Sequence, residues 1–473
     1  MMPADVFQAS TRGPAAVFAA LQARFGDRVT GNATIREQHG NALSEVPNQP
    51  PDLVVFPEST EEVAEIVRCC RAAGVPIIPF GTGTSFEGHV NAPFGGVSVD
   101  LSRLKSILAV HDVDLQCVVE AGVTREELNR SLRDRGLFFP IDPGADASLG
   151  GMAATRASGT NAVRYGTMKD NVLAMTVVLA DGRIARIGGR AGKSAAGYDL
   201  VRLMVGSEGT LGIITELTLR LHGLPEQVAA GICAFPTVKA ACDTVISTIQ
   251  LGIPIARIEL LDEVQVRACN AYSALDLPEQ PLLCVEFHGS PVGVGDQIER
   301  FAEIAGEYGG GELQWAVEPE RRSALWRARH NAYWAARGLR PGTKGISTDV
   351  CVPISQLAAC VVATKEDAAR SGIIAPIVGH VGDGNFHCLP LIDQGDPAEV
   401  ANGRAFVDRL VRRALAFGGT TTGEHGIGQS NMKYLEVEFE EPALDMMRAV
   451  KRALDPDNLM NPGKIVRLSA PML

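Results

Sequence analysis

Four loops built from glycine and small polar residues lie within the first 215 residues of this 473-residue chain. Loops of this kind let the backbone approach a ligand closely and can present successive N–H groups to an anion. One such loop is an ordinary turn, but four in one region favour a site that follows an extended ligand with a pyrophosphate in its middle. The four segments are residues 80–88, 143–152, 159–166 and 206–215.

The first loop, FGTGTSFEG at residues 80–88, ends the apolar run 75–80, which predicts a buried strand. A dinucleotide-binding Rossmann turn needs GxGxxG leading directly into a helix, but here the next glycine comes five residues after Gly83. The segment 188–194 resembles a P-loop, yet Ile187 stands where its first glycine must be. Both motifs are excluded. For the first loop taken alone, a phosphate nest and a plain turn remain alternatives.

The remaining pattern predicts mixed α and β structure. Capping patterns predict helices at residues 59–73 and 124–136, and an Asp-Gly turn predicts a hairpin over residues 171–187. A second region begins after a linker near residue 225. It has predicted strands at 281–288 and 374–378 and predicted helices at 321–337 and 401–416, and a last helix is expected at 443–454.

Composition excludes several classes of protein. Lys+Arg 44 against Asp+Glu 55 gives a net charge of -11, which argues against a nucleic-acid partner. No stretch reaches the roughly 18 apolar residues of a membrane span, and residues 1–18 lack the pattern of a signal peptide. The ten scattered cysteines predict reduced thiols. We therefore expect a cytoplasmic protein, with peripheral contact to the inner membrane as an alternative.

Two glycine-rich motifs near the C-terminus contain three of the nine histidines. In GHVGDGNFH (residues 379–387) the Asp-Gly pair predicts a tight hairpin that sets His380 opposite His387, with Cβ atoms roughly 5 Å apart. GEHGIG (residues 423–428) adds Glu424 and His425. Such side chains could share a metal, or they could be structural histidines beside glycine turns. From the residues alone the two interpretations stand about even.

Eight motifs occur in one order along residues 35–465: PFGTGTSFEG, DPGADASLGGM, GTNAVRYG, KSAAGYDL, VGSEGTLGIIT, GHVGDGNFH, TGEHGIG and NPGK. In this order the chain resembles the D-lactate dehydrogenase (cytochrome-type)/glycolate oxidase branch of the vanillyl-alcohol oxidase/p-cresol methylhydroxylase flavoproteins. The resemblance implies an α+β fold. It has a two-part FAD-binding domain of the p-cresol methylhydroxylase (PCMH) type at 1–225, a substrate-binding domain with an antiparallel sheet and helices at 226–440, and a segment at 441–473 that returns to the FAD domain.

The resemblance also implies the contacts with FAD. Residues 80–88 would wrap the pyrophosphate, and the C-terminal NPGK motif would close over the cofactor. Thr84 and Ser85 stand where members with covalent flavin often carry a histidine, so non-covalent FAD is expected. The implied cofactor-binding residues are Pro79, Gly81, Thr82, Gly83, Thr84, Ser85, Pro143, Gly144, Ser148, Gly151, Gly159, Asn161, Tyr165, Glu208, Gly209, Gly212, Ile214 and Asn461.

For the substrate side, the resemblance implies a divalent metal, Zn²⁺ or Mn²⁺, bound by His380, His387 and Glu424. By its position in the family pattern Arg329 would hold the substrate carboxylate, with Lys344 and Asn385 as further substrate-binding candidates. His425 would act as the base that takes the proton of the α-hydroxyl group, while hydride passes to flavin N5.

The expected reaction is therefore oxidation of a D-2-hydroxy acid, D-lactate first, to the 2-oxo acid. The chain has no haem-binding or iron–sulfur motif, so electrons are expected to go to an external quinone, cytochrome, electron-transfer flavoprotein or oxygen. Glycolate and D-2-hydroxyglutarate are alternative substrates. An aromatic-alcohol oxidase and a non-catalytic subunit of a glycolate oxidase complex are more distant alternatives, and a homodimer is left open.

Overall fold

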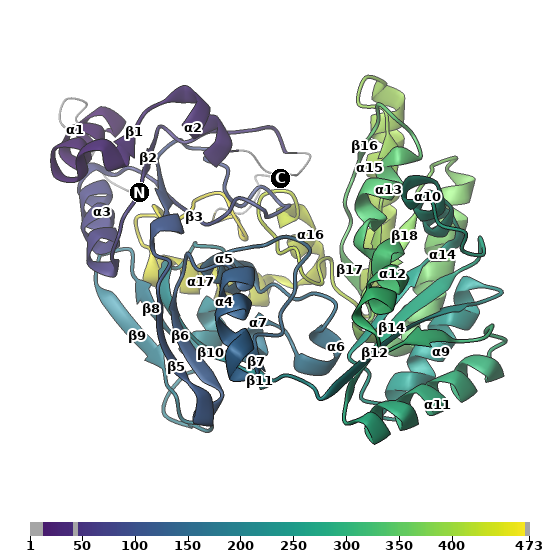
Figure 1. Ribbon diagram of the computed structural model, residues 1–473. Coiled ribbons are helices and arrows are strands. Elements are labelled where there is room, and N and C mark those ends of the chain that lie inside the picture. The colour runs from purple at the N-terminus through teal and green to yellow at the C-terminus, as the bar shows by residue number, and fades with distance from the viewer. Residues whose placement is uncertain (1–12, 41–45, 469–473) are drawn as a thin grey trace. The chain divides into compact units, whose positions relative to one another are not determined.

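The computed structural model describes residues 13–40 and 46–468 (Figure 1). In this part the chain divides into two compact units. Of the described residues, unit 1 contains 13–40, 46–158, 167–223 and 424–468, and unit 2 contains Gly159–Gly166 and Leu224–Gly423. The domain limits 1–225, 226–440 and 441–473 stay predictions, because a unit defined by contacts need not coincide with a domain. Residues 1–12, on which the signal-peptide interpretation mainly rests, lie outside the described residues.

Unit 1 contains a small sheet from which the first glycine loop begins. Its strand order is β1-β2-β4-β3, in which β4 pairs in parallel with both β2 and β3. Apolar residues of α3 (Thr60–Ala73), including Ile66 and Val67, share one core cluster with strand residues such as Val99. The strands are β1 (Val29–Thr30), β2 (Leu53–Val55), β3 (Ile77–Phe80) and β4 (Val97–Asp100).

The second sheet of unit 1 is antiparallel, in the order β5-β6-β10-β8-β9. The predicted hairpin is confirmed as β8 and β9, whose turn contains Gly182 at φ +79°. A two-stranded ribbon pairs β7 with β11. The strands are β5 (Ile107–His111), β6 (Gln116–Glu120), β7 (Leu137–Phe138), β8 (Val172–Val178), β9 (Ile184–Gly188), β10 (Ile213–Arg220) and β11 (His222–Gly223).

Local caps explain where the unit 1 helices begin. Ser59 accepts a hydrogen bond from the Glu62 N–H at the start of α3, and Thr124 and Glu127 form a complete capping box at α4. These two predicted helices are confirmed. The helices besides α3 are α1 (Pro14–Phe25), α2 (Ala33–His39), α4 (Arg125–Leu132), α5 (Leu149–Thr155), α7 (Met168–Asn171), α8 (Leu200–Met204), α16 (Met432–Glu438) and α17 (Glu441–Leu454).

Unit 2 is built on a seven-stranded antiparallel sheet in the order β15-β12-β14-β13-β18-β19-β17. A ribbon of β16 and β20 accompanies it. The strands are β12 (Gln227–Ala234), β13 (Arg257–Leu261), β14 (Leu282–Gly289), β15 (Gln314–Ala316), β16 (Lys344–Gly345), β17 (Val350–Cys351), β18 (Ile377–Gly379), β19 (Asn385–Cys388) and β20 (Leu391–Ile392).

Helices cover both faces of this sheet, because alternate strand residues point to opposite faces. Cys284 shares a core cluster with residues of α10, α12 and α13. Phe287, of opposite parity on the same strand, meets Phe301 of α11 with ring centroids 5.8 Å apart. The helices are α6 (Ala162–Tyr165), α9 (Val238–Gln250), α10 (Glu263–Ser273), α11 (Pro291–Glu307), α12 (Pro319–His330), α13 (Ala332–Gly338), α14 (Leu357–Arg370) and α15 (Pro397–Ala416).

The prediction of a single helix at 321–337 is wrong, because the structure has two helices in this segment. The chain leaves helical geometry at Asn331, between α12 and α13, and the Asn331 side chain donates to the Ser273 hydroxyl at 2.9 Å. A side chain that bonds to a neighbouring helix at this point favours a break that helical periodicity alone does not reveal.

The ten cysteines are all free thiols and lie within the described ranges. Burial raises the pKa of the Cys233 and Cys360 thiols to about 11 and that of Cys351 to about 12, so these groups are protonated at neutral pH. We assign them no chemistry. Among the helices of residues 13–40 and 46–468, none has the length and apolar character needed to cross a membrane.

Candidate active site

Three of the predicted FAD loops meet inside unit 1 at glycines that leave little room for a side chain. A Cβ atom on Gly81 would collide with the Ser148 hydroxyl, and one on Gly209 would lie 2.8 Å from Pro79 Cγ. A Cβ on Gly151 would lie 3.0 Å from the same Ser148 hydroxyl. The backbone of loops 80–88, 143–152 and 206–215 is therefore packed as closely as a cofactor cradle requires. This packing fits FAD, a long ligand whose pyrophosphate needs backbone donors.

The C-terminal NPGK motif (residues 461–464) joins the same loops. The Asn461 N–H donates at 2.8 Å to the carbonyl of Ile77, the first residue of β3, which leads into the first loop. Asn461 Nδ2 donates to the carbonyl oxygens of Glu208 at 2.7 Å and His89 at 3.0 Å. Asn461 has φ +40°, a conformation that asparagine tolerates better than most residues. The Asn461 amide thus connects loop 206–215 to His89, the residue that follows loop 80–88.

Glu208 was predicted as a cofactor residue, and its contacts in unit 1 are with the protein. The carboxylate accepts hydrogen bonds from the N–H groups of Ile427 at 2.7 Å and Gly428 at 2.8 Å. It also lies 3.4 Å from His89 Nε2. Glu208 therefore fixes the segment that follows His425.

The other predicted cofactor residues occupy several positions. Thr82 and Thr84 share a hydroxyl hydrogen bond of 3.2 Å at the first loop, where Gly83 has φ +68°. Ile214 is buried on β10, and a Cβ on Gly212 would meet Val177 of the neighbouring strand. Ser85, Pro143 and Gly144 lie in irregular loop segments of unit 1.

Gly159, Asn161 and Tyr165 belong to unit 2. Asn161 Oδ1 accepts from Arg257 Nε at 2.9 Å, and the Tyr165 hydroxyl is 2.8 Å from His288 Nδ1. His288 Nε2 in turn bonds to Glu286 at 2.7 Å. Burial raises the pKa of Tyr165, so its hydroxyl is neutral and can donate.

The sheet of unit 2 carries a line of polar side chains on one face, which we call the polar row: Glu259, His380, His387 and Asp349. The strand registers explain it. Leu261 pairs with Val378 and Leu260 with Gly379, so the next step sets His380 beside Glu259. Val378 pairs with His387 across β18 and β19. Paired residues point to the same face, so the row crosses four neighbouring strands.

The hairpin predicted for residues 379–387 is wrong in its register. His387 pairs with Val378, not with His380, because Val381–Asp383 form a 3₁₀ turn and Gly384 takes φ +80°. The Asn385 N–H donates to the His380 carbonyl, which closes a longer loop than a two-residue turn. The two imidazole rings are nevertheless neighbours, with centroids 5.4 Å apart and planes at 86°.

Hydrogen bonds fix both histidines of the polar row at the same ring nitrogen. His380 Nδ1 bonds to Glu259 Oε1 at 2.8 Å, and His387 Nδ1 bonds to the Thr348 carbonyl at 2.9 Å. A histidine that donates from Nδ1 offers Nε2 as the metal-binding nitrogen, and such a partner is usual for metal-ligating histidines. His380 and His387 ligand atoms lie within 4.8 Å of each other. The donor set of the row therefore fits a divalent metal.

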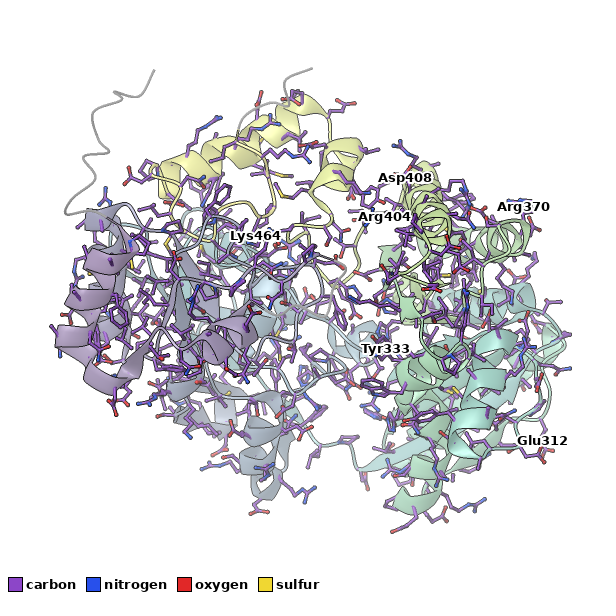
Figure 2. All side chains as sticks on the ribbon, turned by 90° about the horizontal axis from the view of Figure 1, so that it is seen from above. Glu312, Tyr333, Arg370, Arg404, Asp408 and Lys464 are labelled. Carbon is purple, nitrogen blue, oxygen red and sulfur yellow. The ribbon has the colours of Figure 1, made fainter. Side chains whose placement is uncertain are left out.

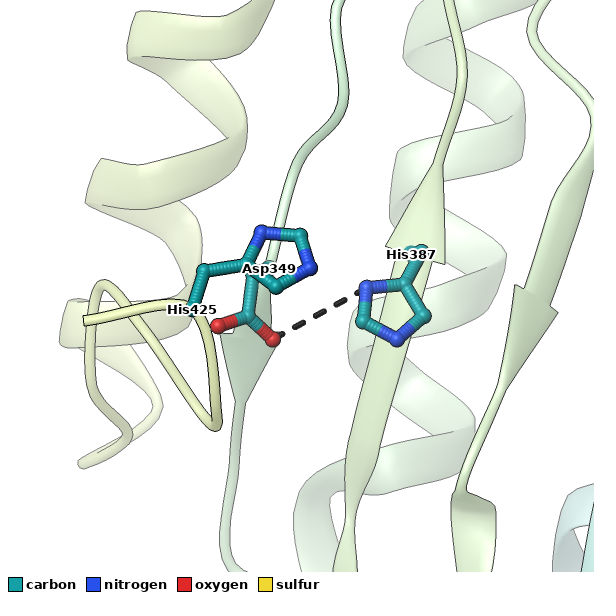
Figure 3. Close-up of side chains that lie close together, drawn as sticks. All are labelled: Asp349, His387 and His425. Atoms are coloured by element: carbon teal, nitrogen blue, oxygen red, sulfur yellow. Dashed lines mark ion pairs between the residues drawn. The ribbon is translucent and has the colours of Figure 1, made fainter. Parts of the chain in front are cut away.

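Asp349 ends the polar row at the edge strand. Its carboxylate lies 3.8 Å from His387 Nδ1 (Figure 3) and accepts from Asn385 Nδ2 at 2.8 Å and from the Thr422 hydroxyl at 2.6 Å. Asn385, a predicted substrate-binding residue, also donates to the Val350 carbonyl at 3.0 Å. Asn385 is thus buried beside the row and orients Asp349.

Arg329, the predicted carboxylate anchor, reaches the other end of the polar row from α12. Its Nε donates to Glu259 Oε2 at 2.7 Å, so Glu259 binds Arg329 and His380 at once. Burial alone would raise the pKa of Glu259, but the charges of His380 and Arg329 and their hydrogen bonds hold it below its ordinary value. Lys344, by contrast, is exposed on β16.

Sequence reasoning missed Glu259 and Asp349. Each is a carboxylate at or beside a mostly apolar strand, within the segments ARIELL and STDVCVP, and this signal was present in the sequence. A buried carboxylate is unfavourable unless it is paired, so such a residue indicates a specific partner. The partners could not be read from the sequence, because they lie up to 121 residues away.

Glu424 and His425 are the first residues of the last segment of unit 1. The Ser158 hydroxyl donates to Glu424 Oε2 at 2.7 Å. His425 Nδ1 lies 3.3 Å from Glu87 Oε1, and the His425 ring stacks on Phe86 with centroids 4.7 Å apart. Glu87 is a further residue that sequence reasoning missed. In unit 2, the Gly423 N–H donates to the Asp349 carbonyl at 3.2 Å, and Glu424 is the next residue of the chain.

Two family models match the chain. Residues 51–188 match an FAD binding domain, and residues 224–465 match the C-terminal domain of the FAD linked oxidases. The second match spans more than half of the 473 residues. The chain belongs to the FAD-linked oxidases. The predicted cofactor FAD and the predicted class, an FAD-dependent oxidoreductase, are thereby confirmed.

Full-length relatives agree with this assignment. The FAD-linked oxidase is 51% identical over 467 residues to "Probable D-lactate dehydrogenase, mitochondrial" of Danio rerio, covering 98% of this chain and 94% of the relative. It is 44% identical over 456 residues to "D-lactate dehydrogenase (cytochrome), mitochondrial" of Arabidopsis thaliana, covering 96% and 80%. It is 35% identical over 421 residues to "Glycolate oxidase subunit GlcD" of Bacillus subtilis, covering 88% and 89%. The predicted resemblance is confirmed.

A solved structure supports the fold. The FAD-linked oxidase superposes on p-cresol methylhydroxylase with TM-score 0.78 at 17% identity, covering 96% of both chains. The predicted α+β fold of the PCMH type is confirmed. The predicted cytoplasmic location is wrong, because the Danio and Arabidopsis relatives are named as mitochondrial proteins.

Proposed function

We propose that this FAD-linked oxidase oxidises a D-2-hydroxy acid, D-lactate, to the 2-oxo acid and passes the electrons to an external acceptor. The observation that carries the proposal is the polar row, which sets two histidines and two carboxylates beside Arg329 on one face of a sheet. An acid with a neighbouring hydroxyl needs such a combination of a cationic anchor and oxygen-binding groups. The relatives named D-lactate dehydrogenase support the choice of acid.

In this proposal Arg329 binds the substrate carboxylate. Its Nε is held by Glu259 at 2.7 Å, which fixes the plane of the guanidinium, and the two Nη groups would meet the carboxylate. Asn385 orients Asp349 beside the row. Lys344 is retained as a candidate contact only by its position in the family pattern.

His425 is the proposed base. The carboxylate of Glu87 lies beside its Nδ1, so Nε2 is the nitrogen that would take the hydroxyl proton, and Glu87 would stabilise the imidazolium that results. Stacking on Phe86 restricts the plane of the ring. His380, His387 and Glu424 are the proposed ligands of a divalent metal, Zn²⁺ or Mn²⁺. When bound, FAD supplies the acceptor for the hydride from Cα, and the metal supplies a Lewis acid for the hydroxyl oxygen.

The acceptor and the location are inferred from the relatives. One relative is named as a cytochrome-type enzyme, so a cytochrome is the proposed acceptor, and the same names favour a mitochondrial location. Non-covalent FAD and the domain limits given above are retained as proposals. Glycolate is the second candidate substrate, because a glycolate oxidase subunit is 35% identical over 88% of this chain.

The proposal is tested by steady-state turnover with a dye acceptor and with ferricytochrome c. D-lactate, L-lactate, glycolate and D-2-hydroxyglutarate are compared as substrates at equal concentration. We expect D-lactate to have the highest kcat/KM and L-lactate to give none above background. A higher kcat/KM for glycolate would replace D-lactate with the second candidate, and turnover of an aromatic alcohol alone would contradict the proposal.

A further inference from the structure

The carboxylate of Glu259 joins two groups to which separate tasks are assigned above. Its Oε2 accepts from Arg329 Nε at 2.7 Å and its Oε1 bonds to His380 Nδ1 at 2.8 Å. Glu259 is completely buried, whereas Arg329 and His380 retain some exposure. Two directional bonds to one rigid carboxylate fix the relative position of a guanidinium and an imidazole.

We propose that Glu259 is a positioning residue that couples the anion-binding site at Arg329 to the metal-binding site at His380. The proposal deepens the function proposed above and rests on it for the tasks of these two side chains. Glu259 touches neither the substrate nor the metal. It would orient His380 so that Nε2 faces the metal and orient Arg329 so that Nη1 and Nη2 face the carboxylate.

The fold explains why one side chain can do both. Glu259 pairs with Cys284 on β14, and Cys284 belongs to the core cluster beneath α12, so Glu259 points toward the helix that carries Arg329. The register of β13 with β18 also sets His380 beside Glu259. Arg329 of α12 and His380, directly after β18, therefore bind the same carboxylate.

A second buried carboxylate in the same sheet provides a matched control. Glu286 bonds to His288 Nε2 at 2.7 Å and lies 3.5 Å from Arg257, so it too joins a histidine and an arginine. The nearby Arg257 and His288 hold the pKa of Glu286 below its ordinary value despite burial, as happens at Glu259. Glu286 is hydrogen-bonded to neither Arg329 nor His380. The substitution Glu286→Gln therefore reproduces the loss of a buried charge without touching the proposed coupling.

The experiment uses the full chain with FAD bound and metal removed by a chelator. Calorimetry gives the Kd of Mn²⁺ without anion, and separately the Kd of oxalate without metal. Oxalate carries adjacent carboxylates and has no C–H bond to lose as hydride, so neither measurement depends on turnover. In Glu259→Gln we expect the Kd of Mn²⁺ to rise about 10- to 100-fold and that of oxalate to rise about 10-fold.

Two further variants separate the effect on metal binding from the effect on anion binding. Arg329→Lys should weaken oxalate binding while the Kd of Mn²⁺ changes by less than about threefold. Glu286→Gln should change the Kd of either ligand by less than about threefold. The double variant Glu259→Gln/Arg329→Lys should bind oxalate no more weakly than Arg329→Lys alone, because both changes remove the same interaction. If Glu259→Gln does not retain FAD, Glu259→Asp, which keeps the charge but is too short to reach both partners, should give the same paired loss.

The proposal is overturned if Glu259→Gln weakens the binding of only one of the two ligands, Mn²⁺ or oxalate. It is also overturned if Glu286→Gln weakens the binding of both to the same extent as Glu259→Gln. It is also overturned if the wild-type protein binds no oxalate in the absence of metal. Failure of the proposed function looks different. If the wild-type protein does not oxidise D-lactate but Glu259→Gln weakens binding of both Mn²⁺ and oxalate, the coupling stands and serves another acid. If the wild-type protein oxidises D-lactate but Glu259→Gln does not weaken both, the proposed function stands and the coupling fails.

Discussion

His425 lies between an aromatic ring and a carboxylate that both come from the end of the first glycine loop. Phe86 stacks on the imidazole at 4.7 Å, and Glu87 lies 3.3 Å from Nδ1. The Ser430 hydroxyl bonds to the second oxygen of Glu87 and holds that carboxylate in turn. The predicted pyrophosphate loop therefore also contacts the proposed base, so that, if both assignments hold, one loop serves cofactor binding and proton transfer.

His425→Ala removes this base. We expect the rate of flavin reduction by D-lactate to fall about 10²- to 10⁴-fold, the usual range for a general base. FAD content is measured on the same sample, so that the rate refers to FAD-bound protein. Stopped-flow absorbance measures the rate. A variant that reduces its flavin within a few-fold of the wild-type rate would refute the assignment.

The substitution Gly81→Ala adds a single Cβ atom and tests whether the glycine loops form the FAD site. In Gly81→Ala the added Cβ would collide with the Ser148 hydroxyl, so either the Ser148 side chain rotates or loops 80–88 and 143–152 separate. We expect the Kd of FAD, measured by reconstitution of the apoprotein, to rise at least about tenfold, which corresponds to roughly 1.4 kcal/mol. Gly192→Ala is the control, because a Cβ there meets nothing within 4 Å. Equal FAD affinity in the two variants would contradict the cradle.

At the scale of elements, local patterns were sufficient where local interactions decide the structure. The helices that begin after Ser59 and Thr124 follow from capping residues three positions apart. The 379–387 loop did not follow from its Asp-Gly signal, because long-range pairing of β18 with β13 and of β19 with β17 fixes both strands. The loop must then fit the register that remains, and it does so with a 3₁₀ turn.

The C-terminal NPGK motif contains a buried lysine whose charge is disfavoured. Lys464 (labelled in Figure 2) donates to the Asn91 carbonyl at 2.8 Å, and burial lowers its pKa from 10.5 to about 7. Between pH 7 and 10.5 the unfolded chain therefore binds a proton here that the folded chain does not. Stability from this group consequently rises with pH across that window.

Lys464→Met should therefore flatten the pH dependence of stability. We expect the wild-type melting temperature to rise from pH 6.5 to 8.5 by a few degrees more than that of the variant. Differential scanning calorimetry of the FAD-bound protein measures both. Lys105→Met, at an exposed lysine of unit 1, should keep the wild-type slope. A variant slope as steep as that of the wild type would show that Lys464 is charged in the folded protein.

At the scale of the whole molecule, family motifs were enough to predict FAD and the two histidines of the polar row. They were not enough to find Glu259, Asp349 and Glu87. Each of these carboxylates contacts a histidine that is distant in the sequence, so its role depends on the fold. The cytoplasmic prediction failed for a different reason, since absent sequence signals do not specify a compartment.

Removal of the proposed metal should affect chemistry and leave the cofactor in place. None of the proposed metal ligands is among the proposed FAD-binding residues, so chelator-treated protein should keep its FAD. Turnover of D-lactate should fall at least about 100-fold, because a Lewis acid at the hydroxyl contributes several kcal/mol. Added Zn²⁺ or Mn²⁺ should restore it. Full activity in a sample with no metal by elemental analysis would exclude the metal from the reaction.

The most direct test is anaerobic titration of the oxidised protein with D-lactate while the visible absorbance of the flavin is followed. We expect one equivalent of D-lactate to bleach the flavin, with one equivalent of pyruvate formed, and L-lactate to leave the spectrum unchanged. A yellow protein that D-lactate does not bleach would contradict the proposed substrate. A protein that neither contains FAD nor takes it up would contradict the function as a whole.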